Sequence, residues 1–137
     1  MPTSLTRVVR FHASHHLWVT AWDEAENRRR FGTLTEPHGH DYECSVTVGG
    51  TTDPQGMVVD LALLDQILEE EVRRPLEGRH LNRDLLTFAQ GRPLPTCEAL
   101  AEFLFEQVRR RLPAGVRLER LRVAEDQTLH ADRTAVE

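Results

Sequence analysis

Residues 38–48 read HGHDYECSVTV, a stretch in which polar and apolar side chains alternate cleanly from Tyr42 onward. Successive side chains of a β-strand point to opposite faces of its sheet, so this alternation is typical of a strand with one buried face. The pattern predicts a strand over residues 42–48, and its buried face consists of every second residue: Tyr42, Cys44, Val46 and Val48.

Three histidines in and before this stretch have the spacing of a metal site built on strands. His38 and His40 are two residues apart, which puts both imidazoles on one face of a strand, and Gly39 between them lets another group approach closely. His15 shares a strand face with the apolar Phe11 and is expected to point inward. Three imidazoles that converge from two strands are the ligand set of a catalytic zinc, which keeps a fourth position open for water or substrate.

The spacing alone leaves other interpretations open. A His-x-His pair on an edge strand can be solvated, and His12 and His16 offer rival ligands from the opposite face. Five of the seven histidines nevertheless lie between positions 12 and 40. That is more clustering than scattered surface imidazoles would give.

Length and charge narrow the class of protein. A chain of 137 residues predicts one domain spanning residues 1–137. The net charge of −5 argues against binding to nucleic acid. Every basic residue is arginine, and we interpret the runs 28–30 and 109–111 as solvated faces; contact with a charged substrate or a neighbouring subunit is the alternative.

Cysteine usage and hydropathy predict a cytoplasmic protein. Cys44 and Cys97 match neither a metal motif nor a disulfide framework, so we expect reduced thiols. No apolar run approaches the roughly 20 residues that a membrane span needs, and the N-terminus lacks the layout of a secretory signal. We therefore expect no membrane partner.

The predicted elements follow in the order strand, strand, helix, helix, strand, strand. Besides residues 42–48, the strands are expected over residues 6–13, 118–125 and 133–137. One helix is expected from the N-cap Asp60 to Pro75, and a second from near Thr96 to the turn at 113–115. The one long irregular segment, residues 17–37, leads into the histidine pair, and loops of that length are usually functional.

Several short motifs, taken in order, resemble the 6-pyruvoyltetrahydropterin synthase and 6-carboxytetrahydropterin synthase family. The resemblance covers nearly the whole chain and implies the α+β tunnelling fold, with an antiparallel four-stranded sheet and two helices on one face. It also implies a homo-oligomer, typically a hexamer, that forms a barrel with active sites between subunits. The motifs that carry it are residues 11–15 (FHASH), 26–32 (ENRRRFG), 37–42 (PHGHDY), 53–61 (DPQGMVVDL), 81–82 (LN), 95–98 (PTCE) and 123–125 (VAE).

The resemblance assigns roles to residues by position. His15, His38 and His40 match the family's three zinc ligands. Glu125 matches the glutamate that anchors the pterin ring, where a carboxylate can accept two parallel hydrogen bonds from the ring amide and amino groups.

Two further positions match residues that contact the same ring. They are Thr96, which can also serve as a helix N-cap, and Cys97, to which we assign no nucleophilic role. Asp41 is a candidate for orienting a zinc-bound imidazole, a role that such ligands usually require.

The sequence departs from the family where proton transfer is expected. Leu34 stands at the position of the family's catalytic cysteine, and Gly78 replaces the histidine of an Asp-His pair. Glu36 could act as the base, because a subgroup of the family uses glutamate while cutting a shorter side chain from dihydroneopterin; an exposed loop carboxylate is the alternative. His80, oriented by Glu77, could replace the lost histidine, or it could be a surface or interface residue.

Two functions are compatible with these residues. The first is a zinc-dependent lyase that acts on the side chain of a reduced pterin, either dihydroneopterin or its triphosphate. The second is a zinc-containing pterin-binding or purine-binding protein, or an enzyme with an unrelated substrate. Leu34 and Gly78 favour the second.

Overall fold

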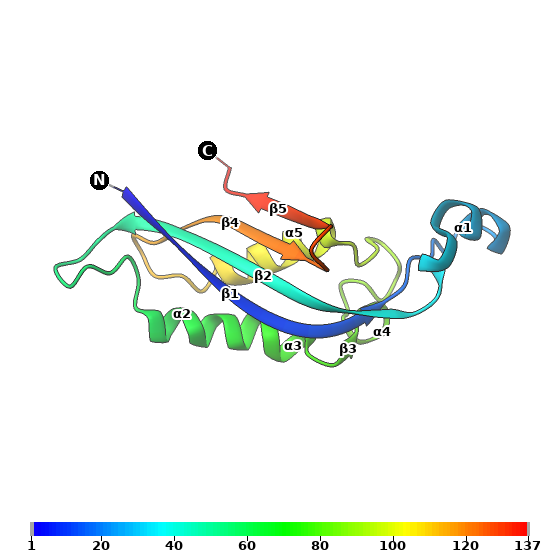
Figure 1. Ribbon diagram of the computed structural model, residues 1–137, viewed down its shortest axis with the longest axis horizontal. Helices are drawn as coiled ribbons and strands as arrows, with labels where there is room; N and C mark the ends of the chain where they lie inside the picture. Colours follow the sequence, from blue (N-terminus) through cyan, green and yellow to red (C-terminus); the bar gives the residue numbers. More distant parts are fainter. Residues whose placement is uncertain (1, 137) are drawn as a thin grey trace.

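Two long antiparallel strands form the centre of the fold. In the computed structural model, which describes residues 2–136, β1 (Pro2–His15) and β2 (His38–Thr51) pair over their full length as the twisted ribbon of Figure 1. Both strands extend beyond the predicted 6–13 and 42–48. Their ends carry polar side chains, so backbone pairing rather than a hydrophobic pattern extends them.

The sheet has five strands in the order β3-β1-β2-β4-β5. β4 (Arg117–Ala124) and β5 (His130–Thr134) pair antiparallel, whereas β3 (Arg79–His80) pairs parallel to the end of β1. The α+β architecture is confirmed, but the predicted four-stranded antiparallel sheet gains a fifth strand and becomes mixed. A strand of two residues leaves no periodic signal in the sequence.

The last strand begins earlier than the predicted 133–137, and Glu137 lies outside the described residues. The carboxylate of Asp126 accepts hydrogen bonds from the backbone N–H groups of Thr128 and Leu129. This tight turn brings the chain back at once, so β5 starts at His130.

Two helical segments cover one face of the sheet. α2 (Leu61–Leu68) continues through a π-helical turn (Glu69–Arg73) into α3 (Arg74–Leu76), while α5 (Cys97–Arg109) lies beside it. The predicted N-caps are confirmed, since Asp60 accepts from the N–H of Ala62 and Thr96 from that of Ala99.

Both helix ends differ from the prediction. Pro75 lies inside α3, which directly follows the π-helical turn, and the helical run ends one residue later, at Leu76. Gly78 ends the run with a φ of +73°, a conformation that favours glycine. α5 ends at Arg109, before the predicted turn at 113–115.

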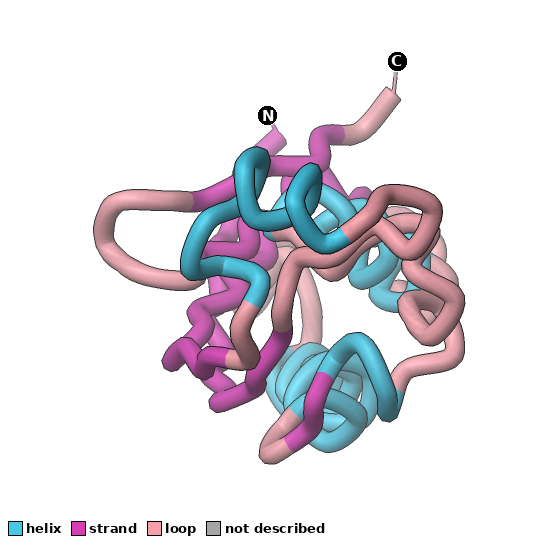
Figure 2. Tube along the Cα trace, turned by 90° about the vertical axis from the view of Figure 1, so that its right-hand side faces the viewer, coloured by secondary structure: helices cyan, strands magenta, loops and turns pink. Residues whose placement is uncertain are grey.

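The segment between the central strands is not irregular as predicted. It contains α1 (Glu24–Phe31), capped by Asp23, and a 3₁₀ turn (Gly32–Thr35). The sequence of α1 is polar on nearly all sides and carries no apolar stripe, which is why periodicity missed it. In Figure 1, α1 projects beyond the end of the sheet that carries β3, and Figure 2 views the molecule from that end.

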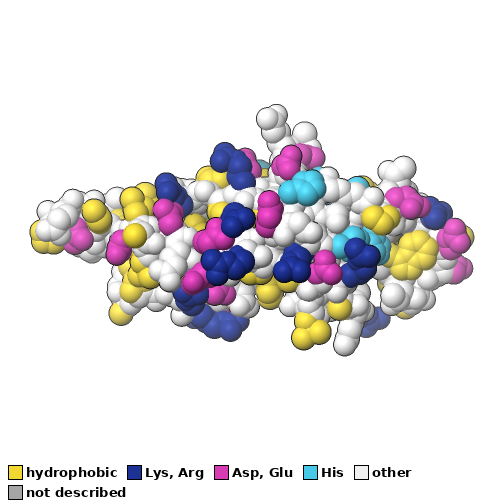
Figure 3. Space-filling view, turned by 90° about the horizontal axis from the view of Figure 1, so that it is seen from below, with side chains coloured by type: hydrophobic (Ala, Val, Ile, Leu, Met, Phe, Trp, Pro, Cys, Tyr) yellow, Lys and Arg dark blue, Asp and Glu magenta, His cyan; other side chains and the backbone are white. Residues whose placement is uncertain are grey.

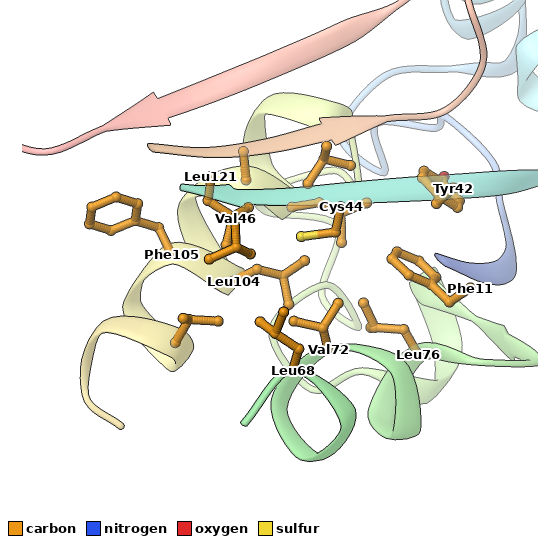
Figure 4. Close-up of a cluster of buried hydrophobic side chains, with 14 of the residues drawn as sticks. Phe11, Tyr42, Cys44, Val46, Leu68, Val72, Leu76, Leu104, Phe105 and Leu121 are labelled. Carbon is orange, nitrogen blue, oxygen red and sulfur yellow. The ribbon is translucent and has the colours of Figure 1, made fainter. Parts of the chain in front are cut away.

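The core lies between the sheet and the helices. The predicted buried face of β2 is confirmed, because Tyr42, Cys44, Val46 and Val48 are all fully buried. Figure 4 shows Val46 and Leu121 of the sheet facing helix side chains. The helix side chains that are buried there include Leu64, Ile67, Leu68, Val72, Leu76, Leu100, Leu104 and Val108.

Surface charges are locally paired. Arg28 and Arg29 bind glutamates of their own segment, and Arg111 binds Glu70 and Glu71. On the face shown in Figure 3, basic and acidic side chains alternate instead of separating into a patch of one sign. Within residues 2–136, the helices are all too short or too polar to cross a bilayer.

The core predicts a large difference between two leucine truncations. Leu104 is fully buried, so Leu104→Ala should lower the free energy of unfolding by about 2–5 kcal/mol. Leu86 is 90% exposed, so Leu86→Ala should change it by less than about 0.5 kcal/mol. Urea denaturation at one fixed protein concentration measures both; equal losses would contradict this description of the core.

Candidate metal centre

The register of β1 and β2 brings the three predicted histidines together. His15 lies directly opposite His38, and His40 lies opposite Ala13, so all three imidazoles share one face at the same end of the ribbon. Their ring centroids are 4.6, 5.2 and 5.0 Å apart. One ring nitrogen from each residue lies within 4.8 Å of the others. The expectation that these side chains converge is met.

Backbone carbonyls fix the tautomers of two of these rings. Nδ1 of His15 lies 2.7 Å from the carbonyl oxygen of Pro95, and Nδ1 of His38 lies 2.8 Å from that of Glu36. A carbonyl oxygen only accepts, so Nδ1 is the donor in both rings and Nε2 is the nitrogen left to bind a metal ion. Metal-binding histidines are oriented by such hydrogen bonds.

The environment of His15 tests whether a cation fits this cluster. Its Nε2 is buried and has no hydrogen-bond partner among the described residues. Burial lowers the pKa of His15 to about 4, so the ring is neutral at physiological pH and its lone pair is available. A buried acceptor without a partner is costly, and a divalent cation would satisfy it. The donor set suits zinc, and also nickel, cobalt or iron.

The predicted ring-binding residues line one side of the cluster. Glu125 follows β4, and its Oε2 lies 3.1 Å from Nε2 of His40 and 3.6 Å from Nε2 of His15. Burial, with the Glu125 carboxylate as a second cause, raises the pKa of Cys97 to about 12. The Cys97 thiol therefore stays protonated and is a poor nucleophile. Thr96 caps α5, directly after the carbonyl that orients His15.

Glu36 contacts the cluster only through its backbone. Its carboxylate extends away from the sheet to Nη1 of Arg28, at 3.2 Å, and Arg28 also binds Glu24. Leu34, at the position of the family's cysteine, is 45% exposed in the 3₁₀ turn.

The structure does not bring Glu77 and His80 together. The Glu77 carboxylate accepts a hydrogen bond from the backbone N–H of His12 at the edge of β1. His80 lies beside His16 instead, with Nε2 of His80 3.4 Å from Nδ1 of His16. Within one chain, Glu77 therefore does not orient His80.

His12, one of the two rival histidines, and Asp41 lie on the opposite face of the ribbon. His12 faces away from the cluster and binds Asp41, with Nδ1 2.9 Å from Oδ1. Asp41 therefore does not orient His15 or His38, which are held by carbonyls. His12 is thereby excluded from the ligand set.

Sequence reasoning missed two asparagines that position the site. Asn82 bonds both the backbone N–H and the carbonyl of His16, which fixes the end of β1. Asn27 is fully buried and bonds the backbone of Val19, Trp22 and Asp23, which holds the segment before His38 in place. Both lie in motifs of the resemblance, which is the signal that could have identified them.

Comparison with known proteins agrees with this geometry. The family model described as 6-pyruvoyl tetrahydropterin synthase matches residues 4–135. The chain belongs to this family. The human 6-pyruvoyl tetrahydrobiopterin synthase is 36% identical over 115 residues, which are 82% of this chain and 78% of that protein. The dihydroneopterin monophosphate aldolase of Pyrococcus furiosus is 29% identical over 111 residues, 81% and 79% of the two chains.

A solved structure of the family has the same fold. The 6-pyruvoyl tetrahydropterin synthase of Caenorhabditis elegans superposes with a TM-score of 0.89 at 27% identity, and the match covers 99% of this chain and 97% of that chain. The predicted tunnelling fold is confirmed.

The histidine cluster predicts the effect of two alanine substitutions. His38→Ala removes one of three converging imidazoles and should weaken metal binding at least about tenfold, without unfolding the chain. His12→Ala changes the same residue type on the opposite face of the same ribbon and should leave metal binding intact. Elemental analysis of protein purified without an affinity tag measures both; stoichiometric metal in His38→Ala would count against this ligand set.

Proposed function

We propose that this protein is a zinc-dependent lyase that acts on the side chain of a reduced pterin, such as dihydroneopterin or one of its phosphate esters. The observation that carries the proposal is the group of three converging histidines beside the carboxylate of Glu125, with Nδ1 of His15 and of His38 held by backbone carbonyls. Family membership supports a reaction on a pterin. The Pyrococcus relative supports dihydroneopterin phosphates in particular.

In this proposal, different residues of the chain contact the ring and the side chain of the substrate. Zinc held by His15, His38 and His40 would polarise a hydroxyl oxygen of the side chain and make the neighbouring protons more acidic. Glu125 would accept two hydrogen bonds from the amide N–H and the amino group of the ring. Thr96 and Cys97, at the start of α5, would contact the same ring.

Glu36 is our candidate for the proton acceptor. It precedes His38 by two residues, and its side chain is exposed, so it can rotate without disturbing the core. An exposed ion pair contributes little to stability, and leaving Arg28 for the substrate therefore costs little. His80, beside His16, is the alternative proton carrier.

Free sheet edges support an oligomer. Among the described residues, β1 pairs with β3 only at Ala13 and Ser14, so the earlier part of its outer edge keeps unpaired backbone groups; the outer edge of β5 does so too. Such edges are templates for pairing with another chain. We propose that copies join at these edges, as a hexamer, and complete each other's sites. A monomeric mass in sedimentation equilibrium would contradict this.

The free cysteines are compatible with the cytoplasm.

A pterin-binding or purine-binding protein without turnover is the second candidate. Gly78 favours it, because a φ of +73° disfavours the histidine that the family has there. The outward direction of Glu36 favours it as well. Calorimetric titration distinguishes the two: tight binding of pterins without conversion supports the second candidate.

Turnover tests the first candidate directly. Zinc-loaded protein should convert at least one of dihydroneopterin, its monophosphate and its triphosphate, with products separated by chromatography and detected by fluorescence. A known family member assayed in parallel is the positive control. If that control is active and this protein converts none of the three, the lyase proposal is wrong.

Two glutamates that share Arg28 provide a matched test of the base. Glu36→Gln should lower kcat by roughly 10²–10⁴-fold, as expected when a general base is lost. Glu24→Gln removes the other carboxylate bound to Arg28 and should stay close to the unmodified rate. A full rate in Glu36→Gln combined with loss in His80→Asn would transfer the role to His80.

A further inference from the structure

Glu125 stands closer to the histidine cluster than ring recognition alone requires. Its Oε2 is 3.1 Å from Nε2 of His40 and 3.6 Å from Nε2 of His15. In a tetrahedral zinc site with bonds of about 2.0 Å, neighbouring ligand atoms are about 3.3 Å apart. The two observed distances lie on either side of that value.

The contact between His15 and Glu125 brings together two groups that bind divalent cations. Nδ1 of His15 lies against the carbonyl oxygen of Pro95, so Nε2 is the ring nitrogen that faces Glu125. Imidazole nitrogens and carboxylate oxygens are both ligands of zinc. The two atoms face each other where the side chains of His15 and Glu125 are only 4% and 15% exposed, so little water can separate them. A metal ion held by His15 would therefore lie within reach of the Glu125 carboxylate.

The backbone around Glu125 is fixed, whereas its side chain contacts only part of the cluster. The N–H of Glu125 binds the carbonyl of Leu129, and Asp126 closes the turn between them. The mutually close ligand group contains the three histidines without Glu125, which touches His15 and His40 only. A small rotation of the Glu125 side chain would therefore move its carboxylate from a position at the metal ion to a position beside it.

We propose that Glu125 alternates between two partners. In the substrate-free protein its carboxylate is the fourth ligand of the metal ion; when a pterin ring binds, the carboxylate moves to the N–H groups of the ring and opens that position for the substrate side chain. This inference rests on the proposed function, because it needs both the metal and the ring.

The two partners of Glu125 must then compete. A ring that draws the carboxylate away weakens the metal site, unless the ligand brings an oxygen of its own, and the metal weakens ring binding by the same factor. A pterin without a side chain is the suitable probe, because it has the ring N–H groups but no hydroxyl to replace Glu125.

Metal titration without turnover tests the proposal. Cobalt and zinc affinities are measured by chelator competition, and the coordination of cobalt by its visible absorption, for the unmodified protein, Glu125→Gln and Glu98→Gln. Glu98 is an exposed carboxylate in the first turn of α5 and serves as the control. Glu125→Gln should bind metal at least about tenfold more weakly and show an altered cobalt spectrum; Glu98→Gln should do neither.

The unmodified protein gives an independent readout. The side-chain-free pterin should weaken its metal binding severalfold and change its cobalt spectrum, and should have no such effect on Glu125→Gln. Equal metal affinity in the unmodified protein and Glu125→Gln would overturn the inference, as would a cobalt spectrum unchanged by bound pterin. Both measurements are made without turnover, whereas the lyase proposal is tested by the activity assay. Failure of one proposal can therefore be distinguished from failure of the other.

Discussion

The register between β1 and β2 is the constraint on which the site depends. His15 opposite His38, with His40 two residues further along β2, places three imidazoles on one face at one end of a ribbon. The same parity buries Tyr42 and Phe11, whose rings stack 5.0 Å apart directly beside the cluster. A shift by one residue would turn the apolar face of β2 toward solvent and the histidines away from each other. The core therefore fixes the geometry of the site.

Segments far apart in the sequence supply the other groups that surround the histidine cluster. The loop before α5 supplies the carbonyl that orients His15, and the turn after β4 supplies Glu125. The carbonyl that orients His38 belongs to Glu36, close by in sequence. Because Nδ1 of His15 and Nδ1 of His38 each donate to a backbone carbonyl, Nε2 of each ring is the nitrogen left for a metal ion. The same hydrogen bonds that orient the rings therefore select the nitrogens that face the cluster.

The parts of the site that follow from strand periodicity could be predicted from the sequence. The contacts of single side chains that can adopt several rotamers could not. Alternation is sufficient to place His15, His38 and His40 together, and cap chemistry is sufficient for Asp60 and Thr96. It does not determine that Glu36 binds Arg28 or that Glu77 binds the backbone of β1, because these depend on rotamers and on loop geometry. The polar helix α1 and the short strand β3 carry no hydrophobic pattern from which they could be inferred. Strand parity alone places Asp41 on the opposite face from His38 and His40, so that correction was contained in the sequence; its pairing with His12 comes from the register.

The departures from the family pattern lie where the scaffold permits them. Leu34 is in an exposed 3₁₀ turn, and Gly78 is in the turn after α3 with a positive φ. Neither position takes part in the pairing of β1 with β2, so a substitution at Leu34 or Gly78 leaves the register that forms the histidine cluster unchanged. A change at His15 or His38, by contrast, would leave a backbone carbonyl without its imidazole donor and would alter this end of the ribbon. In the proposed assignment the acid and base groups of this chain lie on loops while its metal ligands lie on the sheet, so a change of reaction would require changes in the loops and not in the pairing of the strands.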